Sequence, residues 1–189
     1  MNTYQIYTPD SAAEPSKATL QVLQDAFGFV PAVAGLMANS SPLLSSFFAA
    51  FGQFRGFGTF GADERQVLLL SNAVANRSEW AVAFHTLEAL ADGVQPDVVE
   101  ALRRGELPED PRMAALSRLT RTLIDKRGHL DDSDVAAFTA AGFTDEQVLE
   151  AIIGVAVSTM TNYTGNIARP DLEEAVAPHA WKPEYSTGG

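Results

Sequence analysis

Apolar residues recur along this chain at intervals of three and four, the spacing that places them on one face of an α-helix. After Ser41 and Pro42, for example, Phe47, Phe51 and Phe54 follow at positions i, i+4 and i+7. No segment alternates apolar and polar residues over a useful length, as a half-buried strand would. The pattern predicts an all-α fold of about seven or eight helices.

Glycines mark where several of these helices are expected to end. Gly28, Gly93, Gly105, Gly128 and Gly142 each follow a helical pattern, at the position where a left-handed C-cap is favoured. Helices are expected over about 33–37, 63–75, 76–92, 96–104, 131–141 and 144–168, with further helices before Gly28, Gly56 and Gly128. This division predicts a single domain over 16–181, an N-terminal arm over 1–15 and a tail over 182–189.

Two helix starts carry the residue pair of a capping box. Asp63 is followed three residues later by Gln66, and Thr144 by Gln147. An offset of 81 residues superposes the two pairs, and five of the 25 positions from Asp63 onward are identical. This match suggests an internal helical duplication. The helix after Thr144 keeps the helical period through Val148, Ile152, Val155 and Thr159.

Three glycines lie between Gly56 and Gly61, too many for a regular helix. A phosphate-cradling loop is one interpretation of this stretch. However, the order of its glycines matches neither nucleotide-binding fingerprint, and no strand precedes it. A flexible loop between two helices is therefore the favoured interpretation.

Composition excludes several classes of function. The chain has 24 acidic and 13 basic residues and a net charge of −11, which argues against nucleic acid or an anionic membrane as a partner. It has no cysteine, so it can form neither a disulfide nor a thiolate metal site. No signal peptide and no apolar run of about 20 residues is recognisable, so a cytoplasmic protein is expected.

Candidate chemistry is concentrated around His85. Asn76 and Glu79 have the spacing of a second helix cap, so a helix is expected to break near residue 75 and restart. Ser78 cannot act with His85 as a nucleophile and base on one helix, since seven residues rise about 10.5 Å. Glu88, three residues after His85, is within side-chain reach and could orient or charge the imidazole. Glu79 lies off that face.

Other polar and aromatic residues carry weaker signals. Trp80 and Tyr163 are expected to be core aromatics more often than pocket residues, and Asn162 is a candidate polar partner for His85. His129 and His179 are scattered and have no carboxylate at metal-ligand spacing. No metal and no cofactor is therefore expected.

At these residues the sequence resembles the carboxymuconolactone decarboxylase and alkylhydroperoxidase D-like (AhpD-like) proteins. The resemblance covers most of the chain and implies their all-helical fold. It rests on the segments 27–31, 41–42, 76–86, 89, 93–94, 134–138, 142–148, 162–164, 167–168 and 178–181.

The resemblance also implies where the redox site of the peroxidase branch would lie. That branch uses a Cys-x-x-Cys pair, with a histidine four residues after the second cysteine and a glutamate twelve before the first. The corresponding residues here are Ser78, Ala81, His85 and Gln66, so only the histidine is kept. A hydroxyl and a methyl group cannot form a disulfide, and the family's thiol route to peroxide reduction is excluded.

The decarboxylase branch differs from this chain as well. It usually has a glutamate at the position of Ala81, and many relatives have a histidine at the position of Asn166. Three interpretations remain open. In the first, the protein is a diverged enzyme that uses His85 as general acid or base on a small organic substrate, with Asn162, Tyr163, Glu79 or Glu88 as partners. In the second, it is a redox-inactive binding or assembly module. In the third, it is a cysteine-substituted form of an AhpD-like peroxidase.

The resemblance further implies a homo-oligomer, because relatives assemble as dimers, trimers or hexamers. The phenylalanine-rich face of residues 41–60 could serve such an interface, although the monomer core competes for the same side chains.

Overall fold

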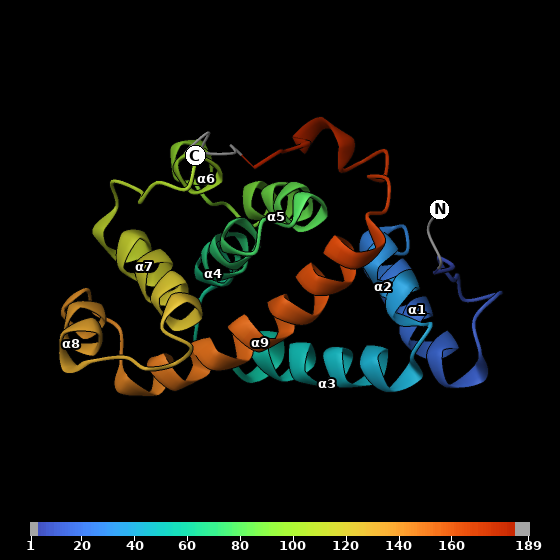
Figure 1. Cartoon of the computed structure of the whole chain (residues 1–189), viewed down its shortest axis with the longest axis horizontal. Coiled ribbons are helices and arrows are strands. Elements are labelled where there is room, and N and C mark those ends of the chain that lie inside the picture. Colours follow the sequence, from blue (N-terminus) through green and yellow to red (C-terminus); the bar gives the residue numbers. More distant parts are fainter. Residues whose placement is uncertain (1–3, 184–189) are drawn as a thin grey trace, which may run out of the picture.

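The computed structural model describes residues 4–183 and contains only helices and connecting segments in that range (Figure 1). The all-α prediction is confirmed. The helices are α1 (Glu14–Phe27), α2 (Ala32–Met37), α3 (Ser41–Phe57), α4 (Ala62–Ala75), α5 (Glu79–Ala91), α6 (Pro96–Arg103), α7 (Pro111–Asp125), α8 (Asp132–Ala140) and α9 (Asp145–Ala168), followed by the 3₁₀ turn η1 (Ala177–His179).

Helix α4 lies at the centre of the bundle. Nine of its 14 residues are buried, and it packs against α5, α6, α7 and α9. Helix α9, drawn in orange, crosses the molecule, and α3 lies beside it (Figure 1). Because α4 faces α5 on one side and α9 on another, side chains from these three helices meet in the core.

The two predicted capping boxes have different outcomes. The pair at Thr144 and Gln147 is confirmed: the Gln147 amide N–H donates to Thr144 Oγ1 at 3.2 Å, and the Thr144 N–H donates to Gln147 Oε1 at 3.0 Å. The Asp63 cap is wrong, because α4 begins one residue earlier and Glu64 accepts the N–H of Gly61 at 2.9 Å. Gln66 is consequently free to turn its side chain into the core.

The predicted break between α4 and α5 is confirmed, but the capping residue is different. Helix α4 ends at Ala75, Arg77 adopts a left-handed φ of 51°, and α5 starts after Ser78. The side chain of Asn76 does not cap α5, since its amide donates to Asn72 Oδ1 at 2.6 Å. The chain reverses sharply here and brings α5 back along α4.

The glycine-rich stretch is not an open anion site. Helix α3 extends through Gly56 to Phe57, and the loop after it wraps around the carboxylate of Glu150 from α9. Glu150 accepts the backbone N–H and the hydroxyl of Thr59 at 2.9 and 2.8 Å. A Cβ at Gly58 would collide with this carboxylate. The protein's own anion therefore fills the loop and fixes it to α9.

The large apolar residues of α9 predict that their own face is buried, but a different face of the helix is buried in the structure. Val148 is buried, but Ile152 is 51% exposed. The buried face of α9 consists largely of small and polar residues, including Ala151, Gly154, Ser158, Thr161, Asn162 and Gly165. A side chain at Gly154 would clash with Leu68, so close packing against α4 requires small residues on this face.

The phenylalanine-rich face of α3 points mainly into the monomer. Phe47 and Phe54 are buried and Phe51 is partly buried, so the core takes most of the surface considered for an interface. Residues 1–3 of the expected arm and residues 184–189 of the expected tail lie outside the described residues. The suggested duplication stays a prediction: α9 is continuous, whereas its counterpart is divided between α4 and α5. No helix between residues 4 and 183 is long and apolar enough to cross a membrane.

Candidate functional site

Helix α5 places His85 in a layer of aromatic rings. Trp80 stacks on Phe84 with ring centroids 4.8 Å apart, and Phe84 meets the His85 ring edge to face at 5.5 Å. The indole N–H of Trp80 donates to Glu173 at 3.0 Å, so the ring has a satisfied polar edge although it is buried. Trp80 and Phe84 occupy one face of α5 because they are four residues apart, and His85 follows directly on the adjoining side of the helix.

This face of α5 borders a cavity of about 50 Å³. Its wall is mainly apolar and draws on α1, α2, α3, α4, α5 and α9. It is formed by Leu23, Phe27, Pro31, Val33, Ala34, Phe47, Phe51, Leu69, Trp80, Phe84, His85, Val157, Ser158 and Thr161. A cavity needs roughly 10–15 Å³ to hold one water molecule, and one of about 150 Å³ holds benzene. This cavity can therefore enclose only a very small molecule or one end of a larger one.

His85 is held from its Nδ1 side by a chain of two hydrogen bonds. Its Nδ1 lies 3.2 Å from Gln66 Oε1, and Gln66 Nε2 donates to Asp92 Oδ2 at 2.8 Å. The carboxylate of Asp92 can only accept, so it fixes which end of the Gln66 amide faces His85. That end is the carbonyl oxygen, so Nδ1 must carry the proton. The imidazole is consequently the Nδ1–H tautomer with a lone pair on Nε2.

The surroundings keep this imidazole neutral. Burial lowers the pKa of His85 from 6.5 to about 4, because no carboxylate contacts the ring to stabilise its charged form. Within residues 4–183, one buried side-chain oxygen or nitrogen lacks a hydrogen-bond partner, and it belongs to Asn162. Nε2 of His85 makes no hydrogen bond either, so it must have accessible surface. The cavity is the open space that His85 lines.

Two hydroxyl groups supply the remaining polarity of the cavity. Thr161 donates its proton to the carbonyl of Ser158 at 2.8 Å, so its oxygen can accept but its proton is used. Ser158 Oγ accepts from Asn162 Nδ2 at 3.3 Å, which leaves its own proton available. No Lys, Arg, Asp or Glu side chain is part of the wall. The site thus offers one acceptor on His85 and one donor on Ser158 in apolar surroundings.

Ser78 and Ala81, where the resemblance places the cysteines of the AhpD-like peroxidases, lie outside this cavity. Ser78 and Ala81 are both 0% exposed, and neither is part of the cavity wall. Ser78 Oγ donates to the carbonyl of Asn162 at 3.5 Å, across the start of α5 to α9. Ser78 and Ala81 are therefore enclosed by packing, whereas Trp80, Phe84 and His85 of the same helix line the cavity.

A buried amide network fills the region next to Ser78. Asn72 Oδ1 accepts from Asn76 at 2.6 Å and from Asn162 at 2.8 Å. The side chain of Asn166 donates to the backbone carbonyl of Asn76 at 2.9 Å. Three candidate polar residues, Asn76, Asn162 and Asn166, thus tie the α4–α5 turn to α9. Of the polar cavity residues, only Ser158 is bonded to this network.

The carboxylate candidates do not contact the ring. Glu79 is exposed, and no hydrogen bond within residues 4–183 joins Glu88 to His85. Burial and the nearby Asp92 carboxylate raise the pKa of Glu88, while Arg55 lowers it. Tyr163 is 56% exposed, so it is not the core aromatic that was expected, whereas Trp80 is both buried and part of the wall. The carboxylate with the clearest link to His85 is Asp92.

Several residues of the site were not identified from the sequence. The sequence indicates Asp92 only as the last residue of a helix, whereas in the structure its carboxylate orients the Gln66 side chain. Ser158 and Thr161 lie three residues apart on a largely apolar helix. This spacing indicates that one face of α9 carries polar atoms. Phe27 and Phe51 come from helices distant in sequence, and no local pattern connects them with His85.

Residues 4–183 contain no cluster of three or more His, Asp or Glu residues that could hold a metal ion.

The helical arrangement places this chain among proteins with the AhpD-like fold. The sequence itself matches no protein-family model and no curated protein. The similarity is visible in solved structures. An uncharacterized peroxidase-related protein from Ralstonia eutropha JMP134, described as an alkylhydroperoxidase AhpD core, has a TM-score of 0.80 and 20% identity, over 92% of this chain and 93% of that chain.

Two further solved structures are similar. An uncharacterized peroxidase-related protein from Silicibacter sp. TM1040 has a TM-score of 0.74 at 16% identity and covers 91% of each chain. The debrominase Bmp8 has a TM-score of 0.69 at 16% identity and covers 88% of each chain. At these identities the likeness establishes the fold, and the chemistry has to be argued from the site.

Proposed function

We propose that this protein is a diverged enzyme of the AhpD-like fold that binds a small neutral organic molecule beside His85 and uses Nε2 as a general base. The observation that carries the proposal is the hydrogen-bond chain from Asp92 through Gln66 to Nδ1 of His85, a residue that also lines an apolar cavity. This chain favours the Nδ1–H tautomer, whose Nε2 lone pair would face the ligand. A donor group on the ligand would bond to Nε2, and an acceptor would bond to Ser158.

The same features limit the substrate. A cavity of about 50 Å³ is about a third of the roughly 150 Å³ that holds benzene, so a substrate of several non-hydrogen atoms must extend through the opening. Its wall has no cation, so a carboxylate or phosphate would lose its hydration without a partner. Neutral alcohols, lactones and undissociated acids meet these limits. The low pKa of His85 favours base over acid catalysis, because the ring carries no proton on Nε2 at neutral pH.

A redox-inactive binding or assembly module is the second candidate. It is favoured by the absence of carboxylates from the cavity wall and by burial, which lowers the pKa of His85 to about 4 and so weakens it as a base. In this case His85 serves only to accept a hydrogen bond from a ligand. The debrominase and the peroxidase-related neighbours share the fold but do not decide between the two.

The experiment is a comparison of His85→Asn with His129→Asn. His129 is exposed on a turn and provides the same substitution away from the cavity. Turnover of a panel of small lactones, alcohols and acids is measured for both variants and the unsubstituted protein. The proposal predicts that kcat/KM for a turned-over substrate falls at least about 100-fold in His85→Asn only. Equal loss in both variants, or none in His85→Asn, contradicts it.

A further inference from the structure

A second hollow lies where three segments distant in sequence meet: the turn between α4 and α5, the end of α6, and the chain after η1. Its volume is about 330 Å³, within the range of roughly 300–1,000 Å³ that is usual for small-molecule sites. Its charged lining consists of Arg77, Arg103, Arg104, Lys182 and Glu100. No residue lines both this hollow and the cavity beside His85, so the two are separate.

The lining of this hollow is positively charged, in contrast to the chain as a whole. Four of the 13 lysines and arginines of the chain line it, together with one carboxylate, Glu100. Arg104 also pairs with Glu106 at 2.9 Å. The carbonyl ends of α4 and α6 contribute about −0.5 charge each. A positive excess therefore remains in the hollow, although the net charge of the protein is −11.

Two of these cations are not used by the fold. Arg77 and Lys182 are both exposed. Neither side chain makes a hydrogen bond or an ion pair with another residue between 4 and 183. They come from opposite parts of the chain and line the same hollow. Their guanidinium and ammonium groups are therefore available to a ligand.

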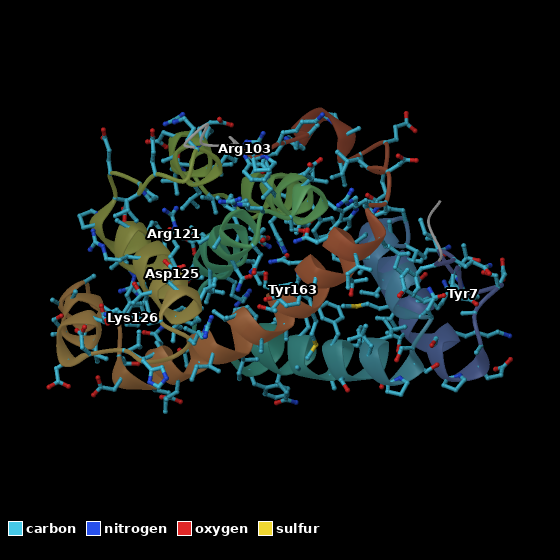
Figure 2. The ribbon with its side chains drawn as sticks, viewed as in Figure 1. Tyr7, Arg103, Arg121, Asp125, Lys126 and Tyr163 are labelled. Carbon is cyan, nitrogen blue, oxygen red and sulfur yellow. The ribbon has the colours of Figure 1, made fainter. Side chains whose placement is uncertain are left out.

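Arg103 instead fixes the shape of the hollow. Its guanidinium donates to Thr86 Oγ1 at 2.8 Å and to the carbonyls of His179 and Ala180 at 3.0 and 3.2 Å. The indole N–H of Trp181 donates back to the Arg103 carbonyl at 2.8 Å. Figure 2 marks Arg103 beside α6, near the C-terminal segment that it binds. These bonds hold the Trp181 ring against α6, so this wall is preorganised before a ligand binds.

The arrangement of the cations favours a phosphate group over a carboxylate. The terminal oxygens of a phosphate dianion accept hydrogen bonds from several sides, whereas a planar carboxylate is suited to one bidentate arginine. Arg77, Arg104 and Lys182 belong to three separate segments of the lining. Trp181, which is partly exposed, adds an aromatic surface for an organic group.

The net charge limits the size of the ligand. A long polyanion would be repelled by the protein's charge of −11 along its whole length. A small dianion in the hollow is affected mainly by the nearest charges, because salt screens exposed charges beyond about 8–10 Å. The hollow is therefore suited to a small phosphorylated molecule and not to a nucleic acid.

We propose that this hollow binds a small phosphate monoester, with Arg77, Arg104 and Lys182 around the phosphate and the organic group against Trp181. The site goes beyond the chemistry proposed for His85. Because the two sites share no lining residue, either can fail a test without the other.

The first test compares Arg77→Gln with Arg127→Gln by isothermal titration calorimetry with phenyl phosphate. Both arginines are exposed, lie two residues past the end of a helix and have φ values of 51° and 53°, but only Arg77 lines the hollow. The unsubstituted protein and Arg127→Gln should bind with a dissociation constant below about 1 mM at low salt. Loss of a charge-assisted hydrogen bond should raise this constant at least about tenfold in Arg77→Gln. Absence of saturable binding, or equal weakening in both variants, overturns the proposal.

The second test identifies the ligand chemistry with benzoate, methyl phosphate and inorganic phosphate. Phenyl phosphate should bind at least about tenfold more tightly than benzoate, which has the ring but a singly charged, planar carboxylate. It should bind about threefold to tenfold more tightly than methyl phosphate or inorganic phosphate, because only its ring packs on Trp181. Benzoate that binds as tightly as phenyl phosphate contradicts a phosphate site. Inorganic phosphate that binds as tightly contradicts an ester as the ligand.

Trp181→Leu tests the aromatic wall separately from the cations. The affinities for phenyl and methyl phosphate should become nearly equal in this variant, because the ring that distinguishes them is gone. A general loosening of the wall would weaken both ligands alike and leave their ratio unchanged. An unchanged ratio therefore contradicts the placement of the organic group against Trp181.

Discussion

Ser78 and Ala81 differ from His85 in their surroundings, although all three belong to the segment around the start of α5 that resembles the AhpD-like redox motif. At its start, Ser78 and Ala81 are completely buried and tied to α9 through Asn162 and its amide network. At His85, two turns further on, the helix borders a cavity. Ser78 and Ala81 thus serve packing in this chain, while His85 lines the cavity.

The pH dependence of stability gives the largest expected effect. His85 binds a proton near pH 6.5 when unfolded and only near pH 4 when folded, so between these values the unfolded state binds more protons. Stability is therefore fully present above pH 6.5 and falls as the pH drops towards 4. A shift from 6.5 to about 4 corresponds to a loss of about 3 kcal/mol.

This prediction is checked by urea unfolding of the unsubstituted protein and of His85→Leu at pH 7 and pH 4. Carboxylates also titrate at low pH, but they do so in both proteins. The loss between the two pH values should be smaller by about 3 kcal/mol in His85→Leu. Parallel losses in the two proteins would show that His85 titrates normally in the folded state.

Removing the amide at the closed end should cost about 2 kcal/mol. Asn72→Ala deletes the acceptor of Asn76 and Asn162 and leaves buried donors without a strong partner. Urea unfolding at pH 7 measures the loss. Asn166→Ala is the graded control, because its half-buried side chain makes one hydrogen bond and should cost about 1 kcal/mol. If Asn72→Ala is no less stable than Asn166→Ala, the network does not hold this region together.

Restoring both cysteines should have the smallest effect on activity. In Ser78→Cys/Ala81→Cys the thiols would replace side chains that are 0% exposed and lie outside the cavity wall. Gln66 also cannot transfer protons as the family's glutamate would. We expect no peroxide reduction and no reaction with a thiol reagent until the protein is unfolded. Rapid reaction of the native thiols would show that the start of α5 is as open as its His85 region.

The sequence predicted the helical fold well, because its signals are local. Helical spacing and the glycine C-caps located most of the elements, and the Thr144–Gln147 box was confirmed. The functional role assigned to His85 from the motif around it stays a prediction. Asp63 shows the limit of such signals: Gly61 and Glu64 form the cap instead, and this releases Gln66 to bind His85.

The cavity and the outward-facing apolar residues of α9 could not be predicted from local sequence signals. The wall brings Phe27, Phe51 and Thr161 together from three helices, and no spacing in the sequence encodes that contact. The largest residues of α9 suggested an apolar core face, but close packing against Leu68 requires the small face at Gly154 to turn inward. Ile152 and its neighbours then face outward. Tertiary packing therefore determines which face of α9 is buried.

The most direct test of the central claim is a ¹⁵N NMR titration of the His85 ring with isopropanol and acetone. Both have four non-hydrogen atoms, but only isopropanol can donate a hydrogen bond to Nε2. A ligand of this size binds no more tightly than tens of micromolar, so millimolar titrations are appropriate. The account predicts an Nδ1–H tautomer whose Nε2 resonance shifts with isopropanol and much less with acetone. A protonated ring at neutral pH, an Nε2–H tautomer, or no response to isopropanol would contradict it.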